Sequence, residues 1–307
     1  MLRPKGRMMA KKARAKTRKY EDILYEVKDQ IAWITINRPR VMNAFREQSL
    51  DEMIDAVKGT REDPSIAAIV FKGAGNDAFS AGGDFYAMKR LNWTNGAMWN
   101  DRMQGLAMAI RGVPIPVIAM VNGWCMGGGH ELALWCDLVI ASEKSMLGQT
   151  GAKVGACPTV GATQYLPRII GERLAREMIF CARRFTAKEA AAIGLINKAV
   201  PERDLLSETL KWCETIKGHS PQTIRMTKKG LNAESDNMYG AWQHGMELLA
   251  HVWGSEESLE GMNAFLQGRK PNFQKFRMKN KRELESYLAG CERDLNAPPS
   301  MRKKKRK

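Results

Sequence analysis

The sequence predicts an α/β fold, in which short buried strands alternate with helices, followed by a segment that is helical throughout. Two observations support this prediction. Apolar, β-branched runs are joined by glycine-rich loops that lead into helical patterns, an order typical of crossover connections. From Asp204 onward the strand patterns stop and helical spacing continues. A length of 307 residues with 44% apolar side chains is enough for one large domain or two small ones.

The first element in the chain is a hairpin. Tyr20–Val27 and Ile31–Asn37 are rich in β-branched residues, and Asp29 lies between them. Pro39 ends the second strand because proline cannot continue a ladder. A helix is expected at Ser49–Thr60, where a serine precedes apolar residues at helical spacing. Further strands are expected at Ile66–Lys72, Pro116–Val121, Cys136–Ala141 and within Ala191–Val200, and further helices at Trp99–Ile110, His130–Trp135, Thr163–Cys181 and Thr186–Ala192.

The domain organisation follows from these patterns. We expect a basic tail at residues 1–19, an α/β core at 20–203, a helical region at 204–278, and a last helix with a second basic tail at 279–307. Helices that stand off a body bury their apolar faces on another subunit or back on the body, so oligomerisation is expected. The helices of this part are expected at Leu205–Ile216, Pro221–Leu231, Tyr239–Val252, Ser255–Leu266 and Lys281–Asp294.

The net charge of +16 is concentrated at the two ends of the chain. Residues 1–19 contain nine Lys and Arg and residues 301–307 contain six, so residues 20–300 carry a net charge of only +1. Like charges repel and bury little apolar area, which predicts disordered tails. Contact with nucleic acid is therefore expected only through the tails, if it occurs.

Several protein classes are disfavoured by the composition. The sequence has no apolar run long enough for a membrane span. Its six cysteines have no metal-binding spacing, and its four histidines form no zinc-protease pattern, so no metal site is expected. The N-terminus lacks the apolar segment of a secretion signal, and a reduced, cytoplasmic protein is the simplest interpretation.

The stretch Val121–Asp137 (VNGWCMGGGHELALWCD) carries the strongest chemical pattern. An apolar run leads through Gly127, Gly128 and Gly129 into a helix, which exposes backbone N–H groups that bind an anion or a developing oxyanion. Glu131 follows Gly128 by three residues and shares a helix face with it. A carboxylate beside these donors can move a proton near a polarised carbonyl group.

Six segments occur in an order and at a spacing that are informative together. They are Asn37–Phe45 (NRPRVMNAF), Ala78–Asp84 (AFSAGGD), Val121–Glu143, Gly148–Gly171, Thr186–Pro201 and Glu260–Phe273. Together they resemble the crotonase superfamily of enoyl-CoA hydratase/isomerase-like proteins, over about residues 20–278. The resemblance implies a spiral of ββα units followed by a helical trimerisation region. It also implies trimers or dimers of trimers that act on acyl-CoA thioesters, with no cofactor beyond the coenzyme A of the substrate.

The resemblance also assigns roles to particular residues. The two backbone donors that stabilise a thioester enolate match Gly83 and Gly128, and Glu131 matches the first catalytic glutamate of enoyl-CoA hydratases. The second glutamate of those enzymes is replaced here by Gly151. Glu131 is then the sole obvious proton carrier, unless a small anion such as bicarbonate replaces the missing carboxylate.

A second branch of the superfamily is also similar. The loop Gly148–Gly155 and the ending Glu260–Phe273 look like dihydroxynaphthoyl-CoA synthase and ketocyclohexanecarboxyl-CoA hydrolases, which close or open carbon rings. Trp253 stands where that branch uses a tyrosine. The segment Phe85–Met103 is rich in large apolar side chains that would suit a bulky acyl group. These side chains are Tyr86, Met88, Leu91, Trp93, Met98, Trp99 and Met103.

The leading hypothesis is an acyl-CoA lyase that adds or removes water on a bulky or alicyclic enoyl-CoA. The alternatives are a ring-opening or ring-closing enzyme and, in another class, an RNA-binding protein of crotonase fold that uses its basic tails. Expected catalytic residues are Glu131, Gly83 and Gly128. Expected substrate- and CoA-binding residues are Arg40, Ala81, Gly82, Asp84, Tyr86, Gly127, Gly151, Trp253, Arg269 and Lys270.

Overall fold

The computed structural model describes residues 19–296, so the two expected tails lie almost entirely outside the described residues. The chain begins with the expected hairpin, in which β1 (Ile23–Lys28) pairs antiparallel with β2 (Ile31–Ile36). Asp29 and Gln30 form its turn with φ angles of 51° and 63°. Two left-handed residues in a two-residue turn match the right-handed twist of the flanking strands.

The larger sheet has six strands in the order β1-β2-β3-β5-β7-β10. All neighbours after the first pair are parallel. The central strands β3, β5 and β7 are largely apolar and buried, and Lys72 is their only charged side chain, as expected for a sheet that is covered on both faces. Besides β1 and β2, the strands of this sheet are β3 (Ala68–Gly73), β5 (Val117–Val121), β7 (Leu138–Ser142) and β10 (Lys198–Val200).

A smaller sheet has four strands in the order β4-β6-β8-β9. Strands of the two sheets alternate along the chain, so the backbone passes repeatedly from the large sheet to the small one and then to a helix. This repeated unit is the expected spiral of β, β and α elements. The strands are β4 (Ala78–Ser80), β6 (Trp124–Met126), β8 (Met146–Gly148) and β9 (Arg184–Thr186).

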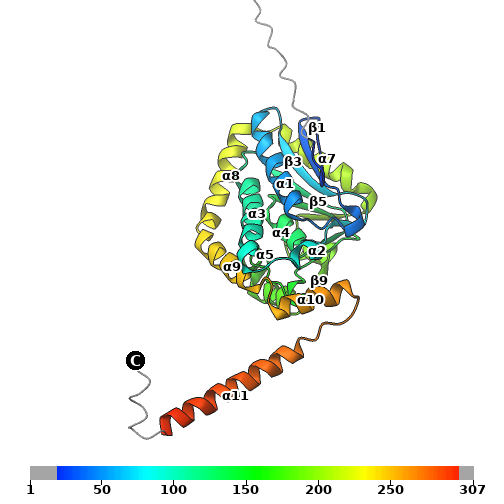
Figure 1. The fold of residues 1–307 in the computed structure, drawn as a ribbon. Coiled ribbons are helices and arrows are strands. Elements are labelled where there is room, and N and C mark those ends of the chain that lie inside the picture. Colours follow the sequence, from blue (N-terminus) through cyan, green and yellow to red (C-terminus); the bar gives the residue numbers. More distant parts are fainter. Residues whose placement is uncertain (1–18, 297–307) are drawn as a thin grey trace, which may run out of the picture.

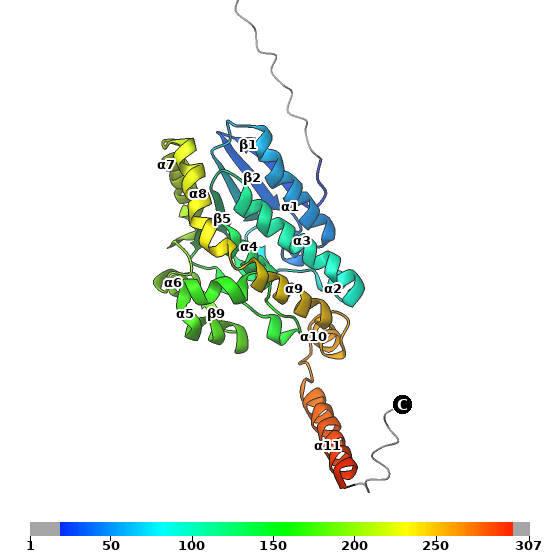
Figure 2. The same ribbon diagram turned by 90° about the vertical axis from the view of Figure 1, so that its left-hand side faces the viewer.

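The body helices cover the sheets, and α1, α3 and α9 lie side by side (Figures 1 and 2). Helix α3 is longer than the sequence predicts because the Asn92 side chain accepts hydrogen bonds from the N–H groups of Thr94 and Asn95 and caps it. The side chains of the first three residues, Trp93, Thr94 and Asn95, are exposed, so the spacing of buried apolar residues did not reveal this start. The helices are α1 (Glu47–Gly59), α2 (Phe85–Met88), α3 (Trp93–Gly112), α4 (Gly128–Trp135), α5 (Ala162–Phe180) and α6 (Ala187–Ala192), with short 3₁₀ turns at Pro39–Val41, Thr60–Glu62, Gly151–Lys153 and Glu202–Asp204.

The helical region begins at Leu205, close to the expected boundary, but it packs directly on the body. Leu205 and Cys213 of α7 join the apolar cluster on one face of the large sheet. Trp242, Leu249 and other side chains of α9 and α10 belong to the main core. The helices are α7 (Leu205–Lys217), α8 (Pro221–Asp236), α9 (Tyr239–Val252), α10 (Glu256–Leu266) and α11 (Gln274–Asn296).

Helix α11 projects from the end of the body next to α10 (Figures 1 and 2). It is longer than the expected Lys281–Asp294. Ion pairs of Lys275 with Glu260 and of Lys279 with Glu256 connect its first turns to α10.

Candidate active site

The centre of the site is the turn between β6 and α4. Gly127 has φ 52° and ψ −124°, a conformation that only glycine adopts readily, and it directly precedes the first residue of α4. Gly128 is that first residue, and the N–H groups of a first helical turn have no partner within the helix. The triple glycine thus turns the backbone sharply and leaves N–H groups available at the helix start, as the sequence predicts.

The loop after β4 lies against this turn. Phe45 and Gly83 form an isolated β-bridge, and the N–H of Asp84 donates to the carbonyl oxygen of Phe45 at 2.9 Å. A Cβ atom placed on Gly82 would lie only 2.8 Å from the backbone nitrogen of Gly128. The two glycine loops, far apart in the sequence, therefore meet as the resemblance implies.

A pocket of about 70 Å³, here called the inner cavity, lies between these loops and α3. Phe45, Met88, Trp99, Met103 and Leu249 form its apolar wall. The structure thus brings together the expected backbone donors, the carboxyl group of Glu131 and Gly151, the glycine at the position of the second glutamate of enoyl-CoA hydratases. The expected site residues that line the inner cavity are Gly83, Gly127, Gly128, Glu131, Gly151 and Trp253.

Glu131 is buried in the inner cavity with 4% of its surface exposed. Burial raises the pKa of its carboxyl group to about 8, although the N–H groups of Ala162 and Val160 act in the opposite direction. The Ala162 N–H, at the first turn of α5, lies 3.4 Å from Oε1. A carboxyl group that exchanges its proton near neutral pH is suited to act as both acid and base.

Gln149 is a site residue that the sequence analysis missed. It lines the inner cavity, and its Nε2 donates to the carbonyl oxygen of Gly127 at 3.2 Å. The same Nε2 lies 3.0 Å from Nδ1 of His130, and burial lowers the pKa of that imidazole to about 4. His130 is therefore neutral and accepts through Nδ1, so Gln149 ties the triple-glycine turn to the end of β8. A glutamine directly before the Gly151 loop was the only signal available in the sequence.

Gly151 lines the cavity near Glu131, and its lack of a side chain is required locally. A Cβ atom there would lie 2.5 Å from the carbonyl oxygen of Ala156. A side chain at position 151 would thus meet the backbone of Ala156.

A larger groove of about 550 Å³, here called the outer groove, lies on the other side of Gly83. Ala81, Asp84 and Tyr86 line it rather than the inner cavity. Asp84 also has structural partners, since it pairs with Arg38 at 2.9 Å and caps α2 by accepting from the Tyr86 N–H. Two cationic side chains that the sequence analysis did not single out, Lys153 and Arg184, lie on the groove wall.

The three cations expected to bind the substrate line neither space. Arg40 is exposed beside Val41 and Met42, which line the outer groove. Arg269 pairs with Glu260 at 2.6 Å, and this pairing holds the pKa of Glu260 at about 2. Lys270 is exposed next to it. Within this chain Arg269 therefore stabilises the segment after α10.

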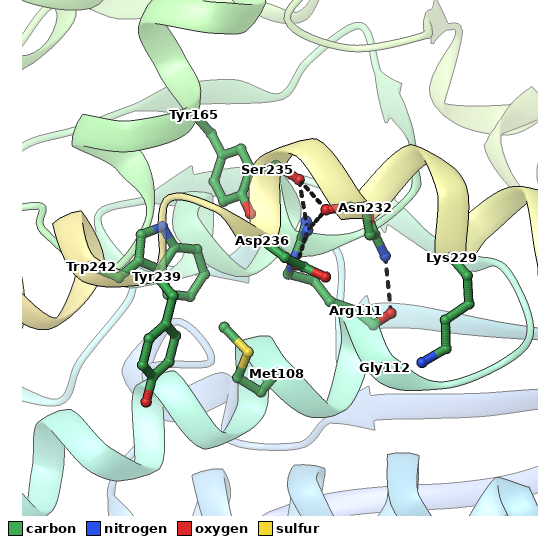
Figure 3. Close-up of a pocket in the computed structure, with 10 residues that line it drawn as sticks. All are labelled: Met108, Arg111, Gly112, Tyr165, Lys229, Asn232, Ser235, Asp236, Tyr239 and Trp242. Atoms are coloured by element: carbon green, nitrogen blue, oxygen red, sulfur yellow. Dashed lines mark hydrogen bonds and ion pairs between the residues drawn. The ribbon is translucent and has the colours of Figure 1, made fainter.

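Another cavity, of about 220 Å³, contains none of the expected site residues (Figure 3). At its centre Arg111 reaches from α3 to the end of α8, where its Nη2 donates to Ser235 and Asp236 at 2.7 Å each. The guanidinium also lies over the ring of Tyr165, 5.3 Å from the centroid. These contacts clamp the start of the α8–α9 connection onto the body.

The described residues also lack the features of two other classes of protein. No group of three or more His, Cys, Asp and Glu side chains there is arranged to hold a metal ion. None of the described helices combines the length and the apolar character that a membrane span requires.

Two sheets in a β, β, α spiral, with glycine loops that meet over a buried glutamate, define an enzyme of the crotonase superfamily. A family model described as enoyl-CoA hydratase/isomerase matches residues 26–277. The chain therefore belongs to the enoyl-CoA hydratase/isomerase family and is an enzyme of that family.

Solved structures support the same assignment. An enoyl-CoA hydratase from Mycobacterium avium subsp. paratuberculosis K-10 is 27% identical, with a TM-score of 0.76 over 83% of this chain and 99% of the other. An enoyl-CoA hydratase/isomerase from Xanthobacter autotrophicus Py2 is 32% identical, with a TM-score of 0.75 over 81% and 94%. An enoyl-CoA hydratase from Bacillus anthracis is 31% identical, with a TM-score of 0.68 over 82% and 99%.

Proposed function

We propose that the protein catalyses the reversible addition of water to the double bond of an enoyl-CoA thioester. The observation that supports this most is Glu131, the only carboxyl group among the described residues that line the inner cavity. Its pKa of about 8 allows both protonation states near neutral pH. The glycines of the two loops lie at the same cavity.

In the proposed mechanism the thioester carbonyl oxygen accepts hydrogen bonds from the N–H groups of Gly83 and Gly128. Negative charge moves to this oxygen when the enolate forms, and fixed backbone donors in a buried site stabilise that charge strongly. Because the helix α4 begins at Gly128, its dipole favours the same charge.

Glu131 carries the proton in both halves of this reaction. Its carboxylate removes a proton from water while the water oxygen bonds to the β-carbon and the enolate forms. The resulting carboxyl group then gives a proton to the α-carbon, which restores the carbonyl group and the carboxylate. One residue thus replaces the two-carboxylate arrangement, and the steps require no metal or redox cofactor.

The outer groove is the proposed binding place for the coenzyme A part of the substrate. It shares Gly83 with the inner cavity, so a thioester at this glycine can extend into both spaces. Lys153 and Arg184 supply positive charge for phosphate groups, and Arg40 lies next to the groove. The indole of Trp124 lies under the Arg184 guanidinium, 5.2 Å from the ring centroid, and orients it.

The bulky or alicyclic acyl group expected from the sequence is not part of this proposal. A cavity of about 70 Å³ is far below the roughly 300–1,000 Å³ of pockets for drug-sized ligands. Of the large side chains in Phe85–Met103, only Met88, Trp99 and Met103 line it. Trp253 offers no free donor for ring chemistry, because its Nε1 already donates to Asn100 at 3.0 Å.

Incubation with a panel of linear and alicyclic enoyl-CoA and ketoacyl-CoA thioesters tests this proposal. We expect a gain of one water in the product mass with the carbon skeleton intact, and the reverse loss from hydroxyacyl-CoA. A product with an opened ring and a new carboxylate would instead support the ring-opening alternative. A folded protein that binds these thioesters and converts none of them would contradict the proposal.

The hydrogen bond of Gln149 to the Gly127 turn leads to a testable prediction. Gln149→Leu keeps the side-chain size but leaves the Gly127 carbonyl without this donor. We expect kcat to fall roughly tenfold with KM changed much less, because the donors become less well placed for the transition state. Steady-state kinetics on the folded variant provide the measurement, and an unchanged kcat would contradict the role of Gln149.

We also propose self-association as a trimer or a dimer of trimers. Helices α8 and α9 expose large apolar side chains, among them Met226 at 65% and Leu231 at 77%. Large apolar side chains exposed on neighbouring helices favour a subunit interface. Light scattering is expected to give a mass in solution of three or six times that of the chain. A monomer at micromolar concentration would contradict the proposed self-association.

A further inference from the structure

We propose that Trp253 closes the acyl end of the inner cavity and makes the protein selective for short acyl groups, of about the size of crotonyl. This inference rests on the proposed function, since it identifies the acyl group that the same site accepts. Trp253 is 4% exposed and lines the cavity together with Leu249 of α9 and Trp99 of α3. The space left within this wall is about 70 Å³, room for only a few carbon atoms.

The indole of Trp253 is held by a hydrogen bond that it donates to α3. Its Nε1 donates to Oδ1 of Asn100 at 3.0 Å. Asn100 is itself only 2% exposed, and its Nδ2 donates to the carbonyl oxygen of Met246 on α9 at 2.8 Å. Rotation of the indole would leave a buried amide without its partner, which is costly. This part of the wall is therefore rigid, unlike the methionines at Met88 and Met103.

The backbone around Trp253 fixes the same position. Trp253 follows the last residue of α9 and has φ −63° and ψ 128°, so the helix ends there and the side chain turns toward α3. On α3, a Cβ atom at Gly96 would lie 2.2 Å from Cδ1 of the indole. The glycine therefore leaves the space that the ring fills. A rigid aromatic ring in a fitted slot defines the depth of a pocket more sharply than flexible side chains do.

The first test compares Trp253→Ala with the parent protein on crotonyl-, hexenoyl- and decenoyl-CoA. The parent is expected to have its highest kcat/KM with crotonyl-CoA. In Trp253→Ala the ratio of kcat/KM for decenoyl-CoA to that for crotonyl-CoA is expected to rise about tenfold or more, because a longer chain gains apolar contact in the opened space. An unchanged ratio in the folded variant, or a parent that prefers decenoyl-CoA, would overturn the inference.

Two further variants serve as comparisons for Trp253→Ala: one keeps an aromatic ring at position 253, and the other removes a tryptophan elsewhere. Trp253→Phe keeps an aromatic ring but loses the bond to Asn100, and is expected to change the preference less than Trp253→Ala. Trp93→Ala also replaces a tryptophan by alanine, but at a position on α3 where the side chain is 68% exposed. This variant is expected to leave the preference for short acyl groups unchanged. An equal shift in Trp93→Ala and Trp253→Ala would also overturn the inference.

Binding of saturated acyl-CoA thioesters separates this inference from the proposed function. Calorimetry on the parent protein is expected to show tighter binding of butyryl-CoA than of decanoyl-CoA, even if no enoyl-CoA is hydrated. Hydration without any preference for short chains would refute the inference and leave the proposed function intact. Tighter binding of butyryl-CoA without hydration would support the inference and refute the function. If Trp253→Ala does not fold, this binding measurement still tests the preference for short acyl groups, and Trp253→Phe tests the contribution of Trp253 to it.

Discussion

Glu131→Gln is expected to lower kcat by about a thousandfold or more and, at the same time, to stabilise the fold at alkaline pH. The loss of activity follows because Glu131 is the only proton carrier proposed for the site, and positioned acid–base groups contribute roughly 10²–10⁴-fold. Glutamine has nearly the same shape as a protonated glutamic acid, so the cavity itself is retained.

The gain in stability follows from the pKa of this buried carboxyl group. In the folded protein the pKa is raised from 4.5 to about 8 by burial. Between these values the folded protein keeps the proton that the unfolded chain releases, so the contribution to the free energy of unfolding falls as pH rises. The amide has no such dependence. The variant should match the parent below about pH 4.5 and exceed it above pH 8, by at most about 5 kcal/mol.

Thermal or urea unfolding of both proteins across pH 4.5–9 measures this difference, and the pH dependence of kcat/KM provides a second measurement. Activity of the parent should rise toward a plateau above about pH 8, because the reaction begins with the carboxylate. Glu172→Gln, the same replacement at a side chain that is 72% exposed, is the matched control. A stability difference that does not vary with pH would show that the Glu131 carboxyl group titrates in the ordinary range.

The sequence predicted the part of this site that local backbone pattern encodes. A strand, three glycines and a helix start at Gly127 are consecutive, so their geometry could be deduced from one segment, and Glu131 followed from helical spacing. The prediction that Gly83 lies close to Gly128 came from the family resemblance instead, because neither segment contains a pattern that predicts contact with the other. Helix ends were missed where polar caps decide them, as at Asn92.

Residues that act between distant segments could not be predicted in this way. Gln149 joins β8 to the α4 turn through side-chain bonds that leave no periodic pattern. The closing of the cavity by Trp253 depends on Asn100, which is 153 positions away in the chain. The expectation of a bulky acyl group was drawn from the number of large apolar side chains, and such a count does not tell which of them fill a cavity and which surround it. That expectation stays a prediction.

Lys228 is the clearest case of a residue that connects distant segments. Its replacement is expected to have a large effect on the stability of the fold. It lies on α8 and was one charge among many in the sequence, yet its side chain is only 6% exposed. Its Nζ donates to the carbonyl oxygens of Ile110 and Ile115 at 2.9 Å each, and to Oδ2 of Asp137 at 2.6 Å. The same Asp137 oxygen accepts from the N–H of Val117, the first residue of β5. This network fastens α8 to the end of α3 and the central strands.

Lys228→Met is expected to lower the free energy of unfolding by about 3–5 kcal/mol, because it leaves two carbonyl oxygens and a carboxylate without their cation. The methionine retains the length of the side chain, so packing changes little. Lys229→Met is the matched control, since Lys229 is exposed and its replacement should cost less than about 0.5 kcal/mol. Urea unfolding of both variants gives the comparison. Equal stability of the two would mean that the network contributes nothing, and that the other contacts of α8, such as those of Arg111 and of Arg168 with Glu234, hold it on the body.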